Sequence, residues 1–299
     1  MIASDCIDQQ LDKYRLIRPL GQSGSSIVYL GEHLQLHIPV AIKVLCRRFT
    51  SGELEGFLAQ AYTFTQLEHP HIVRAFDFGV KDNTPYLVMT YAPHGTLRQR
   101  HSKGTRLPLE TVVSYVKQIA DALQYVHDNK LIHRDIKPHN MLLGHDKEIL
   151  LSDFGIAVTS ESIDADLPGM PDFEGTVLYA APEQLQGKPR RSSDQYALGV
   201  VVYEWLSGEC PFYGSFYEVA RQHIFEAPPS LSREKGIAIA PVVEEVVLKA
   251  LAKDPRKRFG RVVEFAEALE WASYGASIFK VQIRPKRQFI SPFPFAVKA

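Results

Sequence analysis

The sequence predicts an α+β protein of two lobes, a small β-rich lobe followed by a larger, mainly helical lobe. Residues 14–91 contain short runs of β-branched and aromatic residues that are bounded by Gly, Pro, Asn or His. From residue 108 onward the apolar residues recur every three and four positions, which is the period of one helix face. With 299 residues and 45% hydrophobic content, the chain is long enough for two such units and apolar enough to bury their cores.

The first lobe is expected to be a small sheet that carries one helix. Between residues 53 and 67 the apolar side chains lie at helical spacing, at Leu54, Phe57, Leu58, Ala61 and Phe64. We expect strands at residues 14–20, 27–30, 40–45, 72–78 and 86–91. Residues 92–95, which contain a Pro and a Gly, then predict a hinge between the lobes.

The second lobe is expected to be dominated by helices. Helical patterns cover residues 108–126, 194–207, 242–252 and 262–271, with loops at 208–214 and 227–229. After about residue 272 the helical period is lost, and the sequence leaves open whether the remainder is extended, packed on the core or disordered. We therefore divide the chain into an N-terminal extension (1–13), one domain (14–272) with lobes at about 14–91 and 95–272, and a C-terminal tail (273–299).

The composition argues against several classes of protein. Because 34 Lys and Arg balance 34 Asp and Glu, the whole chain has no net field that would attract nucleic acid or anionic lipid, and any polyanion binding must be local. The three cysteines, Cys6, Cys46 and Cys210, lack the spacing of a disulfide framework or a zinc cluster. No apolar run is long enough to span a membrane. We expect a cytoplasmic protein without a membrane span or a nucleic-acid partner, and the sequence leaves its oligomeric state unknown.

A turn of small residues near the start is the first candidate site. Gly21, Gln22, Ser23 and Gly24 lie between two strand-like runs, and Val28 begins the second run. Such a turn lets backbone N–H groups approach phosphate oxygens, although a tight hairpin loop needs the same residues. Lys43 follows the next apolar run, where its ammonium group is expected to lie beneath the turn.

The strongest signal is a group of polar residues beside apolar, strand-like runs. Asp135, Lys137 and Asn140 precede one such run, and Asp153 follows the next. Carboxylate and amide oxygens suit Mg²⁺, a carboxylate can accept a hydroxyl proton, and an ammonium group can neutralise a phosphoryl group. These residue types together point to phosphoryl transfer.

In order and spacing, these segments resemble the eukaryotic-type protein Ser/Thr kinase family, and most closely its bacterial members. The resemblance covers residues 14 to about 272 and rests on five motifs: the Gly21 loop with Val28, Val40-Ala41-Ile42-Lys43, His133-Arg134-Asp135 with Asn140, Asp153-Phe154-Gly155, and Ala181-Pro182-Glu183. It implies the two-lobed protein kinase fold, ATP and Mg²⁺ as cofactors, and transfer of the γ-phosphoryl group to Ser or Thr hydroxyls of protein substrates.

The resemblance also implies a role for each matching residue. The catalytic set would be Asp135, Lys137 and Lys43, and the Mg²⁺ ligands would be Asn140 and Asp153. Nucleotide would be bound by Gly21, Gln22, Ser23, Gly24 and Lys43 at the phosphates, by Val28, Ala41 and Leu142 around the adenine, and by Met89, Thr90, Tyr91 and Ala92 at the gatekeeper and hinge positions. In the second lobe Asp194 would brace the catalytic loop, and Arg258 would pair with Glu183.

Three departures from the family pattern bear on activity. Gln60 stands where the family has a Glu that pairs with the strand lysine, Ser23 and Ser26 replace two loop glycines, and no hydroxyl residue occurs at 163–175. If Gln60 bonds to Lys43, the enzyme is expected to be slower than one with a full ion pair, because only one partner is charged. The alternative is that the chain has lost catalysis and is a pseudokinase, which binds ATP or acts as a scaffold.

Two further alternatives concern the substrate and the activation segment. A small-molecule kinase is disfavoured, because Lys137, Thr176 and residues 181–183 resemble a peptide-binding floor that such enzymes lack. In the activation segment the acceptors closest to Phe154 are Thr159, Ser160 and Ser162. One hypothesis is that a carboxylate among Asp164, Asp166, Asp172 and Glu174 meets Arg134 in place of a phosphate, and the alternative is a solvated acidic loop.

Overall fold

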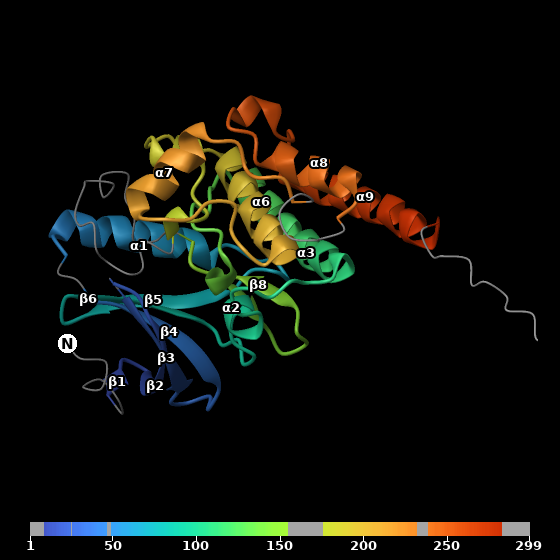
Figure 1. Ribbon diagram of the computed structural model, residues 1–299. Helices are drawn as coiled ribbons and strands as arrows, with labels where there is room; N and C mark the ends of the chain where they lie inside the picture. The colour runs from blue at the N-terminus through green and yellow to red at the C-terminus, as the bar shows by residue number, and fades with distance from the viewer. Residues whose placement is uncertain (1–8, 25, 47–48, 155–175, 232–238, 283–299) are drawn as a thin grey trace, which may run out of the picture.

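The predicted two-lobed fold is confirmed. The computed structural model describes residues 9–24, 26–46, 49–154, 176–231 and 239–282. In Figure 1 a twisted sheet crossed by helix α1 forms one end of the molecule, and a group of longer helices forms the other. The chain passes between the lobes just after strand β6, at the predicted hinge.

The small lobe is built on an antiparallel sheet with the strand order β1-β2-β3-β4-β6-β5. The strands are β1 (Gln10–Leu11), β2 (Tyr14–Gln22), β3 (Ser26–His33), β4 (Pro39–Leu45), β5 (Ala75–Lys81) and β6 (Thr84–Thr90). The register sets Val28 opposite Lys43 and Ala41 opposite Met89. Because β1 pairs with β2, part of the expected N-terminal extension belongs to the sheet.

Helix α1 (Ser51–Thr65) is the predicted helix of the small lobe, and it begins two residues earlier than expected. A capping box fixes this start: the backbone N–H of Glu53 donates to the Thr50 hydroxyl, and the backbone N–H of Thr50 donates to the Glu53 carboxylate. Phe57 and Ala61 are buried on the face that packs against β5.

The expected strand at residues 72–78 was placed too early. Strand β5 starts at Ala75, and the apolar residues before it turn toward the other lobe instead. Ile72 forms a parallel bridge with Leu151, and the backbone N–H of Val73 donates to the Leu151 carbonyl at 3.0 Å. One apolar run of the sequence therefore contacts both lobes. The local pattern of apolar residues does not distinguish such a run from a single strand.

The large lobe is mainly helical, with one short hairpin. Its elements are α2 (Leu97–Arg100), α3 (Leu109–Asp128), η2 (Pro138–Asn140), β7 (Met141–Leu143), β8 (Ile149–Leu151), α5 (Pro182–Leu185), α6 (Arg191–Ser207), α7 (Phe216–Phe225), α8 (Pro241–Ala250), η3 (Pro255–Lys257) and α9 (Val262–Gln282). Residues 193–207 of α6 are all buried, so this helix forms the centre of the lobe. Helix α7 was not predicted, although the Ser215/Glu218 capping box was a readable signal for its start.

The expectation that helical structure ends near residue 272 was wrong, because α9 continues to Gln282. Among the α9 side chains that the structure describes, Ala272 is the last buried one, while Trp271 is 75% exposed and Tyr274 is 58% exposed. The helical backbone thus continues beyond the point where the apolar period of the sequence is lost. Among the described helices, none has both the length and the apolar character that a membrane crossing requires.

Candidate active site

A buried carboxylate holds the segment that carries the strongest sequence signal. Asp194, in the first turn of α6, is 1% exposed. It accepts hydrogen bonds from the backbone N–H of His133 at 2.9 Å and of Arg134 at 2.8 Å. It also lies 2.8 Å from Nε2 of His127. The predicted brace is confirmed, and it explains how Arg134 is held at a φ of 70°, a conformation that is costly for a residue with a side chain.

Asp135 follows Arg134, and its carboxylate has two polar partners. The Asn140 amide nitrogen donates to the Asp135 Oδ2 atom at 2.8 Å, and the Lys137 ammonium group lies 2.9 Å from the same atom. Lys137 also donates to the Thr176 hydroxyl at 2.8 Å. Within the part of the chain that the structure describes, no hydrogen bond reaches the other carboxylate oxygen of Asp135, so this oxygen is available to a ligand.

Lys43 and Asp153 form an ion pair that joins the two lobes. The Lys43 Nζ atom donates to the Asp153 Oδ1 atom at 2.5 Å, and the Lys43 side chain is 14% exposed. Burial opposes ionisation of the carboxyl group, but the charge and hydrogen bond of Lys43 outweigh it and lower the pKa of Asp153. The carboxylate is therefore ionised at neutral pH.

Gln60 does not hold Lys43. Gln60 is half-buried on α1, and among the described residues neither a hydrogen bond nor an ion pair links it to Lys43. The expectation that the amide would bond to the ammonium group is therefore wrong. A charged carboxylate attracts Lys43 more strongly than a neutral amide does, and Asp153 provides it.

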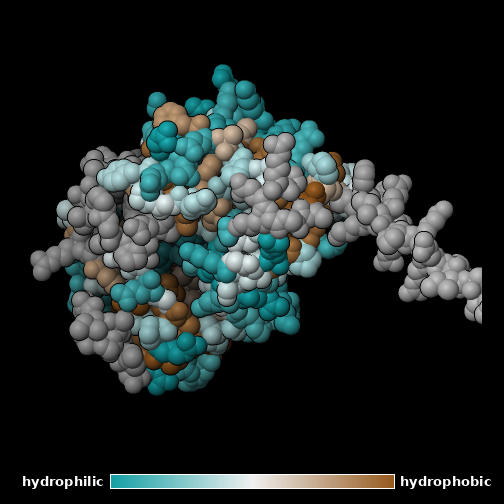
Figure 2. Space-filling view, in the orientation of Figure 1, coloured by the Kyte–Doolittle hydropathy of each residue, from teal (hydrophilic) through white to brown (hydrophobic). Residues whose placement is uncertain are grey.

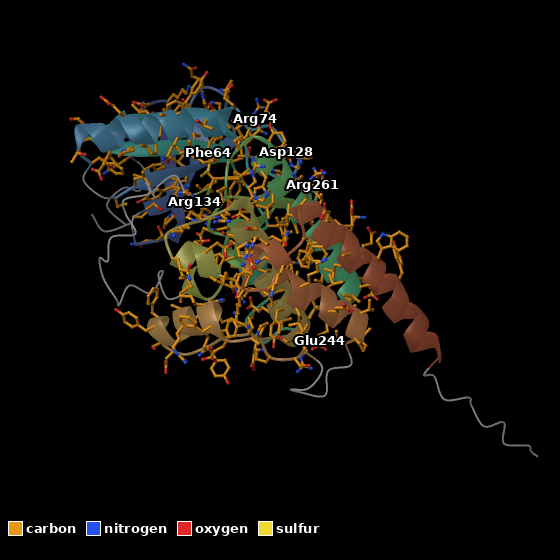
Figure 3. The ribbon with its side chains drawn as sticks, turned by 90° about the horizontal axis from the view of Figure 1, so that it is seen from above. Phe64, Arg74, Asp128, Arg134, Glu244 and Arg261 are labelled. Carbon is orange, nitrogen blue, oxygen red and sulfur yellow. The ribbon has the colours of Figure 1, made fainter. Side chains whose placement is uncertain are left out.

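Contacts between aromatic rings connect α1 to the segment that precedes Asp135. The ring of Phe154 lies 5.3 Å from that of Phe64 on α1 and 4.6 Å from that of His133. Phe64 and Arg134 both lie at the junction of the lobes in Figure 3. Movement of α1 must therefore disturb the packing beside Asp153.

The residues expected around adenine come together in one apolar cluster beside the hinge. Ala41 and Met89 are buried in this cluster, and Val28, Ala92 and Leu142 pack against it. Ala41 and Lys43 are two positions apart on β4, so their side chains lie on the same face of the sheet. Apolar side chains thus adjoin the ammonium group. Tyr91 is half-buried at the hinge.

The small-residue turn joins β2 to β3. The backbone N–H of Ser23 donates to the Ser26 carbonyl at 2.7 Å, and the two hydroxyls lie 2.8 Å apart. None of the described residues of this turn has a positive φ, so the serines that replace glycines cause no backbone strain. A Cβ atom on Gly21 would meet no protein atom within 4 Å, which leaves this edge open to a ligand. Gln22 is exposed beside it.

The oxygen atoms near the pair of Lys43 and Asp153 suit Mg²⁺. Lys43 occupies one carboxylate oxygen of Asp153, and Asn140 uses its amide nitrogen toward Asp135. No other partner of the second Asp153 oxygen or of the Asn140 amide oxygen occurs in the described ranges. Hard oxygen atoms of this kind are the ligands that Mg²⁺ prefers, so these residues fit the ion.

Glu183 and Arg258 form the predicted buried ion pair. The two guanidinium nitrogens of Arg258 donate to the two carboxylate oxygens of Glu183 at 2.7 and 2.9 Å, and the Arg258 side chain is 0% exposed. Burial opposes the ionisation of Glu183, but the hydrogen bonds and charge of Arg258 outweigh it and lower the pKa of Glu183. This pair ties the segment after Thr176 to the end of the helical lobe.

The sequence analysis missed a second buried network below the catalytic loop. Arg98 on α2 donates to both carboxylate oxygens of Glu204 on α6, at 2.7 and 2.8 Å. The Tyr179 hydroxyl donates to the same carboxylate at 2.7 Å. Glu204 stands in a continuous apolar helix pattern, and a charged residue in such a position needs a buried partner, which was the available signal.

Some predicted features lie outside the described residues. They are Gly155, the hydroxyl residues Thr159, Ser160 and Ser162, and the acidic residues Asp164, Asp166, Asp172 and Glu174. The hypothesis that one of these carboxylates meets Arg134 stays a prediction.

Comparison with known proteins decides the family. The family model described as the protein kinase domain matches residues 14–271. The chain belongs to the protein kinase family.

Relatives of this kinase domain include several bacterial kinases. The chain is 36% identical over 262 residues to the serine/threonine-protein kinase PrkC of Bacillus subtilis. This alignment covers 86% of the chain and 39% of PrkC. It is 37% identical over 263 residues to the serine/threonine-protein kinase PknB of Mycobacterium leprae, and this alignment covers 85% of the chain and 42% of PknB. For Pkn1 of Myxococcus xanthus, also a serine/threonine-protein kinase, the identity is 36% over 87% of the chain and 38% of Pkn1. The chain thus spans about two fifths of the length of these relatives.

Proposed function

We propose that this chain is a protein Ser/Thr kinase that transfers the γ-phosphoryl group of ATP to hydroxyl groups of proteins. The observation that carries the proposal is the convergence of charged and amide groups at the junction of the lobes. Lys43 contacts Asp153, and Lys137 and Asn140 both contact Asp135, although these residues come from two lobes. All the direct catalytic groups that the family pattern requires are present, which favours an enzyme over the scaffold alternative.

The nucleotide is expected to lie between the small-residue turn and the apolar cluster. Val28, Ala41 and Leu142 would contact the adenine, with Met89 behind it and the backbone of residues 90–92 along its edge. The open edge at Gly21 would admit phosphate oxygens to the backbone of residues 21–24. Lys43, at the base of this space, would bind the α- and β-phosphates.

Mg²⁺ would be held by Asn140 and Asp153. When bound, the ion supplies positive charge that neutralises the phosphate oxygens during transfer. The chain itself keeps these ligands ready: Lys43 keeps Asp153 ionised, and the contact with Asp135 orients the Asn140 amide. The proposed site of action is the cytoplasm, where ATP is available, in a signalling role.

Asp135 would accept the proton of the substrate hydroxyl. Lys137 and Asn140 both engage its Oδ2 atom, which fixes the carboxylate and leaves the second oxygen for the hydroxyl. As the hydroxyl oxygen bonds to the γ-phosphorus, the bond between that phosphorus and the β,γ-bridging oxygen breaks. The products are ADP and a phosphorylated Ser or Thr, and the released proton goes to Asp135. Lys137 would meanwhile face the charge on the transferred group.

A labelling experiment with radioactive ATP and a generic protein acceptor tests this proposal. Lys43→Met and Asp135→Asn are each expected to abolish transfer while the circular dichroism spectrum stays unchanged. Lys257→Met and Asp146→Asn change the same residue types at exposed positions and serve as matched controls. Full transfer by either site variant would refute the assignment, and nucleotide binding without transfer by the unmodified chain would favour the pseudokinase.

A further inference from the structure

The chain has no net charge, but one segment beside the active site carries positive charges and no negative ones. Residues 83–109 contain no Asp or Glu, whereas they contain Arg98, Arg100, Lys103 and Arg106. This segment runs from strand β6 through the hinge and α2 to the start of α3. A local field is therefore present that the balanced composition conceals.

Backbone contacts hold this segment against strand β7, which directly follows Asn140. The backbone N–H of Leu143 donates to the Gly95 carbonyl at 2.9 Å, and that of His94 donates to the Leu143 carbonyl at 3.3 Å. Helix α2 packs directly on η2, which lies between Lys137 and strand β7. Helix α2, which carries Arg98 and Arg100, thus adjoins the residues that surround Asp135.

Two carboxylates beside this segment are already paired within the protein. One guanidinium nitrogen of Arg98 donates to both oxygens of Glu204, whose side chain is 6% exposed. Asp135 is paired with Lys137. The negative charges of Glu204 and Asp135 are therefore offset by cations of the protein.

Other cations of the segment are not neutralised by the protein. Arg100, Lys103 and Arg106 are exposed, and none of them forms an ion pair with any described residue. Arg106 donates only to the backbone carbonyl of Ser207, at 3.0 Å. Hydrophilic side chains cover the region of α2 and β8 in Figure 2. We call Arg100, Lys103 and Arg106 the α2 basic surface.

We propose that the α2 basic surface binds acidic side chains of the protein substrate next to the Ser or Thr that is phosphorylated. The proposal rests on the proposed function, since it requires a peptide whose hydroxyl lies at Asp135. An extended peptide in that position continues past η2 and α2, and its carboxylates meet exposed cations there. A peptide fits better than nucleic acid, because the surface is small, it adjoins the acceptor position, and the whole chain has no net positive charge.

Three peptides test the preference. They share one Ser acceptor and differ only in the residues around it, which are Glu, Gln or Lys. We expect kcat/KM for the Glu peptide to exceed that for the Gln peptide by about five- to tenfold, and the Lys peptide to be poorest, since each exposed ion pair contributes modestly. The preference is expected to shrink as salt is raised, because exposed charges are screened.

The double variant Arg100→Glu, Lys103→Glu is expected to reverse the order of the Glu and Lys peptides. The ratio of the two peptides is compared within each variant, so that a general loss of activity cancels. Arg74→Glu makes the same kind of charge change on the exposed surface of the small lobe, where Arg74 is 62% exposed (Figure 3), and should keep the wild-type order. An unchanged order in the double variant would overturn the proposal.

A binding measurement separates this proposal from the proposed function. Peptides with Ala in place of the acceptor Ser are titrated into fluorescently labelled protein, which reports binding without catalysis. Tighter binding of the Glu peptide without transfer to the Ser peptides would support the surface and contradict the kinase function. Equal binding and equal transfer for all three peptides would support the kinase function and contradict the proposed role of the α2 basic surface. Displacement of the Glu peptide by short duplex DNA at equal charge concentration would assign the surface to nucleic acid and overturn the proposal.

Discussion

Lys43 and Asp153 lie 110 positions apart in the chain, and their side chains meet at 2.5 Å between the two lobes. The residue that the family pattern places beside Lys43, Gln60, takes no part in this contact. The strand lysine is therefore held from the large lobe and not from α1. The position of α1 depends instead on apolar contacts such as that between Phe64 and Phe154.

This arrangement predicts that Gln60→Glu increases activity. A carboxylate on α1 would compete with Asp153 for Lys43, link the helix to the strand, and release Asp153 for Mg²⁺. We expect kcat/KM for ATP to rise about five- to tenfold, which corresponds to about 1.0 to 1.4 kcal/mol of transition-state stabilisation. Ala59→Glu adds the same charge at an exposed neighbouring position and is the control. An equal gain in both variants would show that charge on α1 acts without Lys43.

Much of the site was predictable because its motifs are short and lie next to turns. Asp135, Lys137 and Asn140 fall within six positions, so their proximity follows from one loop. The contact between Lys43 and Asp153 was not predictable in the same way. It depends on the relative placement of the two lobes, and family resemblance assigned Lys43 to a different partner.

The network of Arg98 and Glu204 shows another limit of the sequence. These residues lie 106 positions apart, and nothing in the local pattern around Arg98 distinguishes it from an exposed arginine. The helix of Glu204 was predicted correctly, but a helix period does not identify which polar residue inside it is paired. The same limit applies to α9, which continues to Gln282 although the apolar period of the sequence is lost after about residue 272.

Arg258→Leu is expected to destabilise the protein strongly. The substitution leaves Glu183 buried without its partner, and loss of one member of a buried ion pair costs about 3 to 5 kcal/mol. Urea denaturation, followed by circular dichroism, measures the free energy of unfolding. Arg256→Leu changes the same residue type two positions earlier, where the side chain is 86% exposed, and should change that free energy by less than about 1 kcal/mol. Similar losses in the two variants would contradict the assigned role of the buried pair.

The same pair predicts a dependence of stability on acid. Burial raises and Arg258 lowers the pKa of Glu183, and the net effect is a folded-state pKa below its ordinary value of 4.5. A lowered pKa means that the unfolded chain binds protons more readily, so the contribution of Glu183 is complete above pH 4.5 and is lost as the pH falls through the folded-state pKa. Glu183→Gln should therefore be less stable than the wild type at pH 7 and should lose less stability on acidification. The free energy of unfolding, measured in urea from pH 7 to pH 3, checks this, and parallel pH profiles would contradict it.

Shortening a side chain is expected to destabilise the protein on the buried face of α9 and to have little effect on its exposed face. Leu269 is fully buried where α9 packs on α3 and α8, so Leu269→Ala removes apolar contacts and leaves a cavity, at a cost of about 2 to 5 kcal/mol. Trp271, two positions later, is 75% exposed, and Trp271→Ala should change the free energy of unfolding by about 0.5 kcal/mol or less despite the larger side chain. Thermal and urea denaturation of both variants test this contrast. A large loss for Trp271→Ala would mean that the indole is covered in solution by another part of the protein, because exposed apolar area by itself contributes little to folding.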